Sequence, residues 1–508
     1  MEATTTSPDA AKMIEVTNPA TGALVERVRA TAPSDIPAAA AAARAAQAAW
    51  ATRSWRERAD VIARFHDLIL ERQELVLDTI QTESGKARRD ALIELTTVAG
   101  TARYYLAHGR QHLAEDRRRA AIPLITGARS AWRPHPLVGL ITPWNFPFLL
   151  GVADALPALL AGCAVLTKPS EETPRSTLLA RDLLVEAGLD PALFQPLIGS
   201  GAELGAPLIE EVDYLGFTGS AAVGRIVAHG AAERLIPFSL ELGGKNPMIV
   251  LPGADLEDAV HGLITGAFAN AGQTCIAVER IYVHEQIWDE FVSAARARVR
   301  DIKLGWSQDF ETEMGSVTSA EHAEKVRAHI NDATSRGATV LAGGSEPIEG
   351  LPATFIRPTL LTDTDPSMLV HATETFGPVV RLERVASEED AILRANDSEL
   401  GLNASIWAGS RKDGRRIARR LEVGAANVNS TLLIYHSFDV PMGGIRGSGL
   451  GRRHGAEGIR RFCRQLSVVE SFERNGGYEM LLRGMRTARR SRLLLRVIRL
   501  WRRIPGIR

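Results

Sequence analysis

The chain has 508 residues, of which 45% are hydrophobic and 24% charged, an ordinary globular composition with room for two to four domains at about 150 residues each. Its three cysteines include no Cys-x-x-Cys pair, which excludes a disulfide framework, and we expect a reducing, cytoplasmic location. The 60 basic and 60 acidic residues balance because ten arginines lie within 481–508; positions 1–480 are acidic, so we expect no nucleic-acid partner.

An alanine-rich segment at 34–50 opens a helical stretch that apolar spacing extends to about residue 118. Short apolar runs then alternate with helices or loops. This alternation predicts an α/β fold with a doubly wound parallel sheet covered on both faces. The five expected strands are Val138–Pro143, Ala164–Pro169, Leu193–Ile198, Tyr214–Thr218 and Phe238–Leu242.

One apolar stretch, Phe148–Thr167, is long enough to suggest a membrane span. Asp154 and Pro157 interrupt it, and Gly162 divides it into a helix over 148–161 and a short strand. We therefore expect a buried helix–strand pair instead.

The helix after the second strand has clear end signals. Thr173 is predicted to be its N-cap, Pro174 suits its first turn, and Gly188 ends it. After Gly243 the alternation restarts and predicts a second α/β domain. Its first elements are strand Met248–Leu251, helix 255–270, strand Ile281–Val283 and helix 285–302.

Three short motifs lie between these elements. Cys275 ends Phe-Ala-Asn-Ala-Gly-Gln-Thr-Cys, Glu241 begins Glu-Leu-Gly-Gly-Lys-Asn-Pro, and Asn145 lies in Thr-Pro-Trp-Asn-Phe-Pro after the first strand. A lone cysteine is usually a small buried hydrophobe, which is our interpretation of Cys163 and Cys463. The joint occurrence of the three motifs, in this order, favours a reactive site at Cys275.

Together the motifs resemble the aldehyde dehydrogenase superfamily over about 13–469. The segment 447–458 is similar to bacterial succinate-semialdehyde dehydrogenases. Further segments in the family's order are Lys168-Pro-Ser-Glu171, Gly216-Phe-Thr-Gly219-Ser220, Glu374-Thr-Phe376 and Pro441-Met-Gly-Gly444. The resemblance implies a split Rossmann-type dinucleotide-binding domain (10–118 and 138–244), an α/β catalytic domain (245–429), a small β oligomerisation flap (119–137 and 430–470) and a basic tail (471–508).

The resemblance makes Cys275 the nucleophile, because an aldehyde releases hydride only after its carbon becomes tetrahedral. The side-chain amide of Asn145 and the backbone N–H of Cys275 would stabilise the oxyanion. Glu241 would be the general base for the water that hydrolyses the resulting thioester. Transfer to coenzyme A is the rival reaction, which Glu241 disfavours. A non-catalytic structural protein is the other rival, and it would have lost one of these residues.

No Gly-x-Gly-x-x-Gly follows the first strand, so the usual dinucleotide fingerprint is absent. Instead, Gly219 and Ser220 open a helix whose N-terminus can face a pyrophosphate. The resemblance assigns the nicotinamide ribose to Glu374 and places Phe376 near the nicotinamide ring. No metal site is expected.

By the same resemblance, Lys168 and Glu171 hold the adenosine ribose. A carboxylate there repels a 2′-phosphate, so Glu171 favours NAD as cofactor, with NADP left open. Lys245 and the segment 83–86 also match family positions, and we interpret them as structural.

The substrate is a small-molecule aldehyde whose identity the sequence leaves open. Family members suited to succinate semialdehyde carry arginines eight residues after the asparagine and six before the cysteine, where this chain has Ala153 and Ala269. Arg446 is the candidate replacement cation. The alternative is a long-chain or aryl aldehyde, which an apolar tunnel wall would suit. The residues expected in that wall are Phe148, Leu149, Leu150 and Val152.

Two features concern assembly. The segment Ala131-Trp-Arg-Pro-His-Pro136 is predicted to be an edge strand, which must be paired, so we expect a homodimer or homotetramer. Arginines spaced three and four apart predict a basic amphipathic helix within 481–508. Three alternatives stay open for this tail. It contacts the inner face of an anionic membrane, it docks on the acidic body of the protein, or it is disordered.

Overall fold

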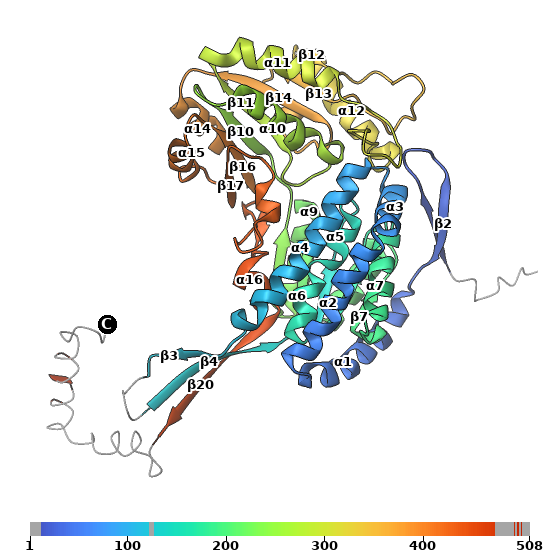
Figure 1. Ribbon diagram of the computed structural model, residues 1–508, viewed down its shortest axis with the longest axis vertical. Helices are drawn as coiled ribbons and strands as arrows, with labels where there is room; N and C mark the ends of the chain where they lie inside the picture. The colour runs from blue at the N-terminus through green and yellow to red at the C-terminus, as the bar shows by residue number, and fades with distance from the viewer. Residues whose placement is uncertain (1–11, 121–125, 473–491, 493–494, 497–498, 500–508) are drawn as a thin grey trace, which may run out of the picture. The chain divides into compact units, whose positions relative to one another are not determined.

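The computed structural model describes residues 12–120, 126–472 and the single positions 492, 495, 496 and 499 (Figure 1). The chain divides into a larger unit, 1–112 with 134–462, and a smaller unit, 113–133 with 463–508. Apart from those four positions, the predicted basic helix at 481–508 lies outside the described residues. Within the described part of the chain, no helix combines the length and apolarity that crossing a membrane requires.

The first sheet of the larger unit has five parallel strands and one antiparallel edge strand. Its order is β7-β6-β5-β8-β9-β19, so the chain adds strands first on one side of β5 and then on the other. The carboxyl ends beside such a reversal form the crevice in which doubly wound sheets bind ligands. The strands are β5 (Leu137–Ile141), β6 (Ala164–Lys168), β7 (Phe194–Pro196), β8 (Tyr214–Thr218), β9 (Phe238–Glu241) and β19 (Gly449–Leu450).

The second sheet has the order β12-β13-β14-β11-β10-β16-β17, and all pairs are parallel except β12 with β13. Every residue of β10 and β16 is buried, as expected for central strands covered on both faces. The strands are β10 (Asn246–Val250), β11 (Val278–His284), β12 (Thr339–Ala342), β13 (Thr359–Thr362), β14 (Val379–Val385), β16 (Asn403–Trp407) and β17 (Ala425–Val428). Two such sheets confirm the predicted α/β class.

The predicted helical stretch at the N-terminal end is four helices (Figure 1). Ser54 begins the second of them with a capping box, because its hydroxyl accepts from the N–H of Glu57 and the Glu57 side chain accepts from the N–H of Ser54. The stretch ends at His112, earlier than the predicted 118, and a short strand follows. The helices are α1 (Ile36–Thr52), α2 (Trp55–Glu71), α3 (Gln73–Ser84) and α4 (Arg88–His112).

The apolar stretch at 148–167 differs from the prediction in one detail. Its helical part is two helices, α5 (Pro147–Val152) and α6 (Ala155–Ala161), followed by β6. Pro157 has no N–H to donate to the carbonyl of Ala153, so a continuous helix would lose a bond there. Gly162 ends α6 in the left-handed region with φ 105°, as the sequence indicated.

Thr173 is not the N-cap of the next helix, α7 (Arg175–Glu186), which corrects that prediction. Its hydroxyl donates instead to the carbonyl of Trp144 at 3.4 Å. The first N–H groups of the helix are satisfied by the buried carboxylate of Glu83, which accepts from the N–H of Arg175 at 2.8 Å and of Ser176 at 2.9 Å. A cap supplied from a distant helix leaves no local sequence signal.

The remaining helices of the larger unit connect or cover the two sheets; α8 and α9 flank the first and α10 and α11 the second. Two small two-stranded pairs complete the unit, β1 (Met13–Thr17) with β2 (Leu24–Arg29) and β15 (Leu400–Gly401) with β18 (Ile445–Arg446). The helices are α8 (Gly201–Glu211), α9 (Ala221–Glu233), α10 (Leu256–Phe268), α11 (Trp288–Arg300), α12 (Ala320–Ser335), α13 (Leu369–Ala372), α14 (Glu388–Asn396), α15 (Arg411–Ala418) and α16 (Gly455–Arg460).

The smaller unit is a three-stranded sheet of order β20-β4-β3, with β3 (Asp116–Arg118), β4 (Thr126–Pro134) and β20 (Cys463–Ser471). The strand expected to be an edge, within β4, is the central one, because it pairs on both sides; β20 and β3 are the edges. Residues 430–462, predicted to belong to the flap, lie in the larger unit. The functional names given to the predicted domains stay predictions.

Candidate functional site

The carboxyl ends of β5, β8 and β9 open onto one cavity of about 240 Å³ in the larger unit. Asn145 lies four residues beyond the end of β5, Gly219 and Ser220 follow β8, and Glu241 is the last residue of β9. The reversal of strand order between β5 and β8 therefore brings these residues together. Cys275, Glu374 and Phe376, from the side of the second sheet, also line the cavity.

Cys275 is held by a distorted turn just before β11. Asn270 and Ala271 have φ of 52° and 53°, the left-handed region that non-glycine residues rarely adopt. A Cβ on Gly272 would lie 2.2 Å from the carbonyl oxygen of Gly377, so the glycine is required for close approach. Such strain persists where surrounding contacts hold it, which is common at functional sites.

Side chains of this turn tie it to the Asn145 loop. The amide of Asn270 donates to the Asn145 carbonyl at 2.8 Å, and the amide of Asn145 donates to the Gln273 carbonyl at 2.9 Å. The side-chain oxygen of Gln273 accepts from the N–H of Thr318 at 2.8 Å. The Asn and Gln of the cysteine motif therefore position the two loops against each other.

The Cys275 thiol is half-buried, and its sulfur lies 3.6 Å from the hydroxyl of Tyr435. Burial raises the pKa of the thiol to about 11, although the Tyr435 bond and the charge of Arg453 act in the opposite direction. A thiol in this environment is protonated at neutral pH. It needs a base or an added positive charge to become a nucleophile.

Asn145 is fixed through its backbone. Its carbonyl accepts from the Lys86 ammonium at 2.8 Å, and Lys86 forms a buried ion pair with Glu94 at 2.6 Å. The Glu94 carboxylate also accepts from two N–H groups at the start of α5, both at 2.9 Å. Among the described residues, the buried Oδ1 of Asn145 has no hydrogen-bond partner. The second hydrogen of its amide is available to an oxygen in the cavity.

Glu241 is buried, and its Oε1 has no hydrogen-bond partner within the described part of the chain. Burial raises the pKa of its carboxyl to about 7, against the nearby positive charges of Arg453 and Arg461. The carboxyl is therefore divided between its two protonation states near neutral pH, which suits a general base.

The opposite side of the cavity carries Glu374 and Phe376. Burial raises the pKa of Glu374 to about 8, and its carboxyl accepts from the N–H of Gly244 at 2.9 Å. Phe376 has φ 57° and lies edge-on to Trp144 with ring centroids 5.5 Å apart. Its N–H donates to Glu279 at 3.0 Å, and Glu279 also pairs with the buried ammonium of Lys245.

Lys168 and Glu171 are not among the residues that line this cavity. Lys168, at the end of β6, donates to the carbonyls of Pro169 at 3.0 Å and Gly199 at 2.9 Å, and to Glu171 at 3.2 Å. Ser220 caps α9 by accepting from the N–H of Val223 at 3.4 Å. Seven of the nine predicted site residues therefore line one cavity. The other two, Lys168 at the end of β6 and Glu171 after it, do not line it.

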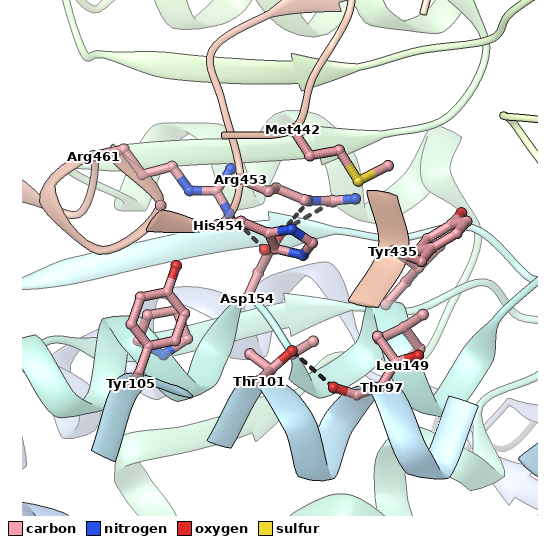
Figure 2. A pocket seen from close by; sticks show the side chains of 14 residues that line it. Thr97, Thr101, Tyr105, Leu149, Asp154, Tyr435, Met442, Arg453, His454 and Arg461 are labelled. Atoms are coloured by element: carbon pink, nitrogen blue, oxygen red, sulfur yellow. Dashed lines mark hydrogen bonds and ion pairs between the residues drawn. The ribbon is translucent and has the colours of Figure 1, made fainter. Parts of the chain in front are cut away.

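A second, smaller cavity of about 40 Å³ shares Leu150, Tyr435 and Arg453 with the first (Figure 2). Of the predicted apolar wall, Leu149 and Leu150 line it, whereas Phe148 and Val152 are fully buried in α5 and line neither cavity. Ala153 lines the smaller cavity, but Ala269 lines neither of the two.

Arg446, the expected replacement cation, lies elsewhere. Its guanidinium donates to the carbonyls of Asn396 at 3.2 Å and Ser398 at 2.8 Å. Two other cations line the Cys275 cavity, Lys325 and Arg453, and the sequence analysis predicted neither of them as a site residue. The Arg-Arg-His run at 452–454 was a visible signal, but nothing local showed which arginine turns inward.

Comparison with known proteins agrees with this geometry. The family model described as "Aldehyde dehydrogenase family" matches residues 5–468. A Mycolicibacterium smegmatis protein with the provisional name succinate-semialdehyde dehydrogenase, NADP(+), is 44% identical over 438 residues, 86% of this chain and 84% of the relative.

Comparison with solved structures finds similar folds in enzymes of this kind. An NADP-dependent enzyme of Escherichia coli has a TM-score of 0.87 at 32% identity, covering 91% of this chain and 95% of that one. An aldehyde dehydrogenase of Bacillus cereus in complex with NAD+ has a TM-score of 0.86 at 34% identity, covering 91% and 94%.

Proposed function

Because this chain belongs to the aldehyde dehydrogenase family, we propose that Cys275, Asn145 and Glu241 carry out its oxidation of an aldehyde to a carboxylic acid. The observation that carries the assignment is that one cavity is lined by a thiol, an amide with a spare hydrogen and a carboxyl group whose Oε1 has no partner among the described residues. These are the nucleophile, the oxyanion donor and the base that the reaction needs.

The cavity suits a nicotinamide cofactor, and its position at the strand-order reversal is where doubly wound sheets bind dinucleotides. We propose that Gly219 and Ser220 hold the pyrophosphate at the start of α9. Glu374 would bind the nicotinamide ribose and Phe376 would pack near the ring. When bound, oxidised nicotinamide supplies the hydride acceptor. Lys168 and Glu171 would hold the adenosine ribose, and the Glu171 carboxylate favours NAD over NADP.

The first step is attack of the Cys275 sulfur on the aldehyde carbon. The thiol proton must leave, and Glu241, whose pKa burial raises to about 7, can accept a proton near neutrality. The C–S bond forms as the carbonyl oxygen becomes an oxyanion. The amide of Asn145 and the N–H of Cys275 stabilise that charge, and losing one such donor typically costs about 3 kcal/mol.

Loss of hydride from the tetrahedral carbon leaves a thioester on Cys275. After Glu241 has released the thiol proton to solvent, its carboxylate removes a proton from a water molecule, whose oxygen attacks the thioester carbon. The C–S bond breaks, the carboxylic acid is released and the thiol is restored. Transfer of the acyl group to water is favoured over transfer to coenzyme A. The reason is that Glu241, whose Oε1 has no partner among the described residues, lines the same cavity as Cys275.

For the substrate we propose succinate semialdehyde, the aldehyde in the name of the 44%-identical mycobacterial relative. A long-chain or aryl aldehyde is the alternative, supported by the apolar side chains of Leu149 and Leu150. The space beyond them is about 40 Å³ and is lined by Asp154, Arg453 and Arg461, which suits a short, charged end better than a long alkyl chain.

Steady-state kinetics test this assignment. We expect kcat/KM with succinate semialdehyde to exceed that with butanal and decanal, and NAD to be used better than NADP. Higher kcat/KM with decanal would instead support the apolar alternative. A kcat/KM with NADP equal to that with NAD would overturn the role given to Glu171.

We also propose that the protein is a homodimer or homotetramer. In the smaller unit, the edge strand β20 exposes Val469 at 70%, and Phe472 just beyond it is 59% exposed. A monomer in light scattering at micromolar concentration would contradict this. A cytoplasmic location, with or without membrane contact through 481–508, stays a prediction.

A further inference from the structure

An ion cluster between the two cavities joins Asp154 to Arg453 and Arg461, and the carboxyl of Glu241 lies within the electrostatic reach of both arginines. Asp154 pairs with two arginines, Arg453 at 2.9 Å and Arg461 at 2.5 Å. His454 adds no charge at neutral pH because burial lowers its pKa to about 4. Both guanidinium groups therefore share Asp154 as their directly paired carboxylate among the described residues, at side-chain exposures of 14% for Arg453, 10% for Arg461 and 15% for Asp154.

Two other buried pairs of the larger unit each join one lysine to one glutamate. Lys86 pairs with Glu94, and Lys245 with Glu279, one cation to one anion. A buried guanidinium is costly unless its donors are paired, so a donor left unused in a cavity favours an anionic ligand.

Both arginines have an unused donor among the described residues, Arg461 at its buried Nε, but of the two Arg453 alone lines both cavities. Its Nε donates to Asp154 and its Nη2 to the hydroxyl of Thr218 at 2.6 Å. Its Nη1 has no hydrogen-bond partner among the described residues, and Arg453 lines both cavities. Figure 2 shows its guanidinium above Asp154, directed toward the side that Tyr435 lines.

Arg461 is placed differently. It donates through Nη1 to the hydroxyl of Ser239 at 3.3 Å, and its guanidinium carbon lies 4.6 Å from the centroid of the Phe462 ring. It lines the smaller cavity but not the Cys275 cavity. Its position makes it the standing partner of Asp154, so Asp154 would keep one cation if Arg453 were replaced.

We propose that Arg453 determines substrate specificity by binding the carboxylate at the far end of an ω-oxo acid whose aldehyde carbon reacts with Cys275. The inference rests on the proposed function. A planar carboxylate accepts hydrogen bonds with the geometry that a guanidinium offers, and the bond is charge-assisted. It replaces the arginines absent at Ala153 and Ala269, and Arg446 has no part in it because its donors serve distant carbonyls.

The test compares two four-carbon aldehydes, succinate semialdehyde and butanal, which differ by the carboxylate. In the full-length enzyme, Arg453→Met should lower kcat/KM for succinate semialdehyde by about 10- to 100-fold, the range for a hydrogen bond to a charged group. With butanal, measured at about pH 9, where Glu241 is ionised in the wild type and in the variant, the change should be less than about 3-fold. Arg453→Lys should retain more activity with the acid than Arg453→Met, and Arg446→Met should change neither substrate's kcat/KM.

A second measurement is independent of turnover of the acid. Succinate should inhibit butanal oxidation competitively in the wild type, and its inhibition constant should rise by a similar factor in Arg453→Met. An equal loss with both aldehydes, or an unchanged inhibition constant, would overturn the inference. If the wild type prefers butanal to succinate semialdehyde, the proposed substrate is wrong. Kinetics of the wild type alone show this outcome, so it is distinct from a failure of the role given to Arg453.

Discussion

Two groups of buried polar side chains in the larger unit differ in how fully their hydrogen bonds are used. Beneath the Asn145 loop, Lys86 and Glu94 bond to each other and to backbone groups. In the Cys275 cavity, Glu241 Oε1 and Asn145 Oδ1 have no partner among the described residues. Saturated groups fix the shape of the loops, whereas groups with spare capacity in a cavity are suited to bind and react. Substitutions should therefore divide into those that affect stability and those that affect activity.

The largest expected effect is at the thiol. Cys275→Ala removes the nucleophile, so aldehyde-dependent formation of reduced cofactor should fall by on the order of 10⁴-fold or more. Its melting temperature should stay near that of the wild type, because among the described residues the half-buried thiol makes one long hydrogen bond, at 3.6 Å. The control is Cys163→Ala: Cys163 is fully buried away from the cavity, and its kcat should stay within about 3-fold of wild type even if the fold is weakened. Residual turnover above about 1% in Cys275→Ala would contradict the assignment.

A substitution in the Lys86–Glu94 pair, whose hydrogen bonds are fully used, should instead lower the stability of the fold. Lys86→Met leaves the fully buried Glu94 carboxylate without its cation, which typically costs about 3–5 kcal/mol of unfolding free energy. Chemical denaturation monitored by fluorescence measures the loss.

The matched control for that substitution is Lys12→Met, which breaks the exposed pair with Glu203 and should cost less than about 1 kcal/mol. Equal losses in the two lysine variants would remove the distinction between the two groups of buried side chains.

Glu241→Gln separates the two half-reactions. The amide cannot act as the base for thioester hydrolysis, so steady-state turnover should fall by about 10²- to 10⁴-fold. In this variant solvent must take the Cys275 proton, but attack by Cys275 needs to occur only once for each enzyme molecule, so a slowed burst of up to one equivalent of reduced cofactor should precede the slow phase. Stopped-flow absorbance measures it. Stability should change little, because Oε1 has no partner to lose among the described residues. If turnover is slow but mass spectrometry detects no covalent thioester, Glu241 is not the base for thioester hydrolysis.

The sequence predicted most of the fold and the chemistry, and the failures share a cause. Strand–helix alternation identified both parallel sheets, because each strand and helix carries its own local pattern. The cap of α7 was missed because Glu83 supplies it from another helix. The position of β4 at the centre of its sheet depends on β20, which lies more than 300 residues away. Tyr435 and Arg453 were missed for the same reason, since their place beside Cys275 is set by tertiary contacts.

The smallest predicted effect concerns the field of Arg453 on Glu241. The base works as the carboxylate, so the rate of thioester hydrolysis should rise with pH and level off above about 7, the pKa to which burial raises this carboxyl. The positive charge of Arg453 lowers that pKa. Removing the charge in Arg453→Met should therefore move the midpoint to higher pH, by about one unit for a nearby charge.

Thioester hydrolysis can be measured by rapid quench with butanal as substrate. Because butanal has no carboxylate, the proposed contact between Arg453 and the substrate carboxylate does not affect this measurement. Arg453→Lys retains the charge and should keep the midpoint close to that of the wild type, and so should Arg446→Met, whose guanidinium bonds to carbonyls elsewhere. A midpoint that moves to lower pH in Arg453→Met, or that moves equally in Arg453→Lys, would show that the arginine acts on Glu241 through packing and not through its charge. The cavity's unsatisfied carboxylate would then owe its reactivity to burial alone.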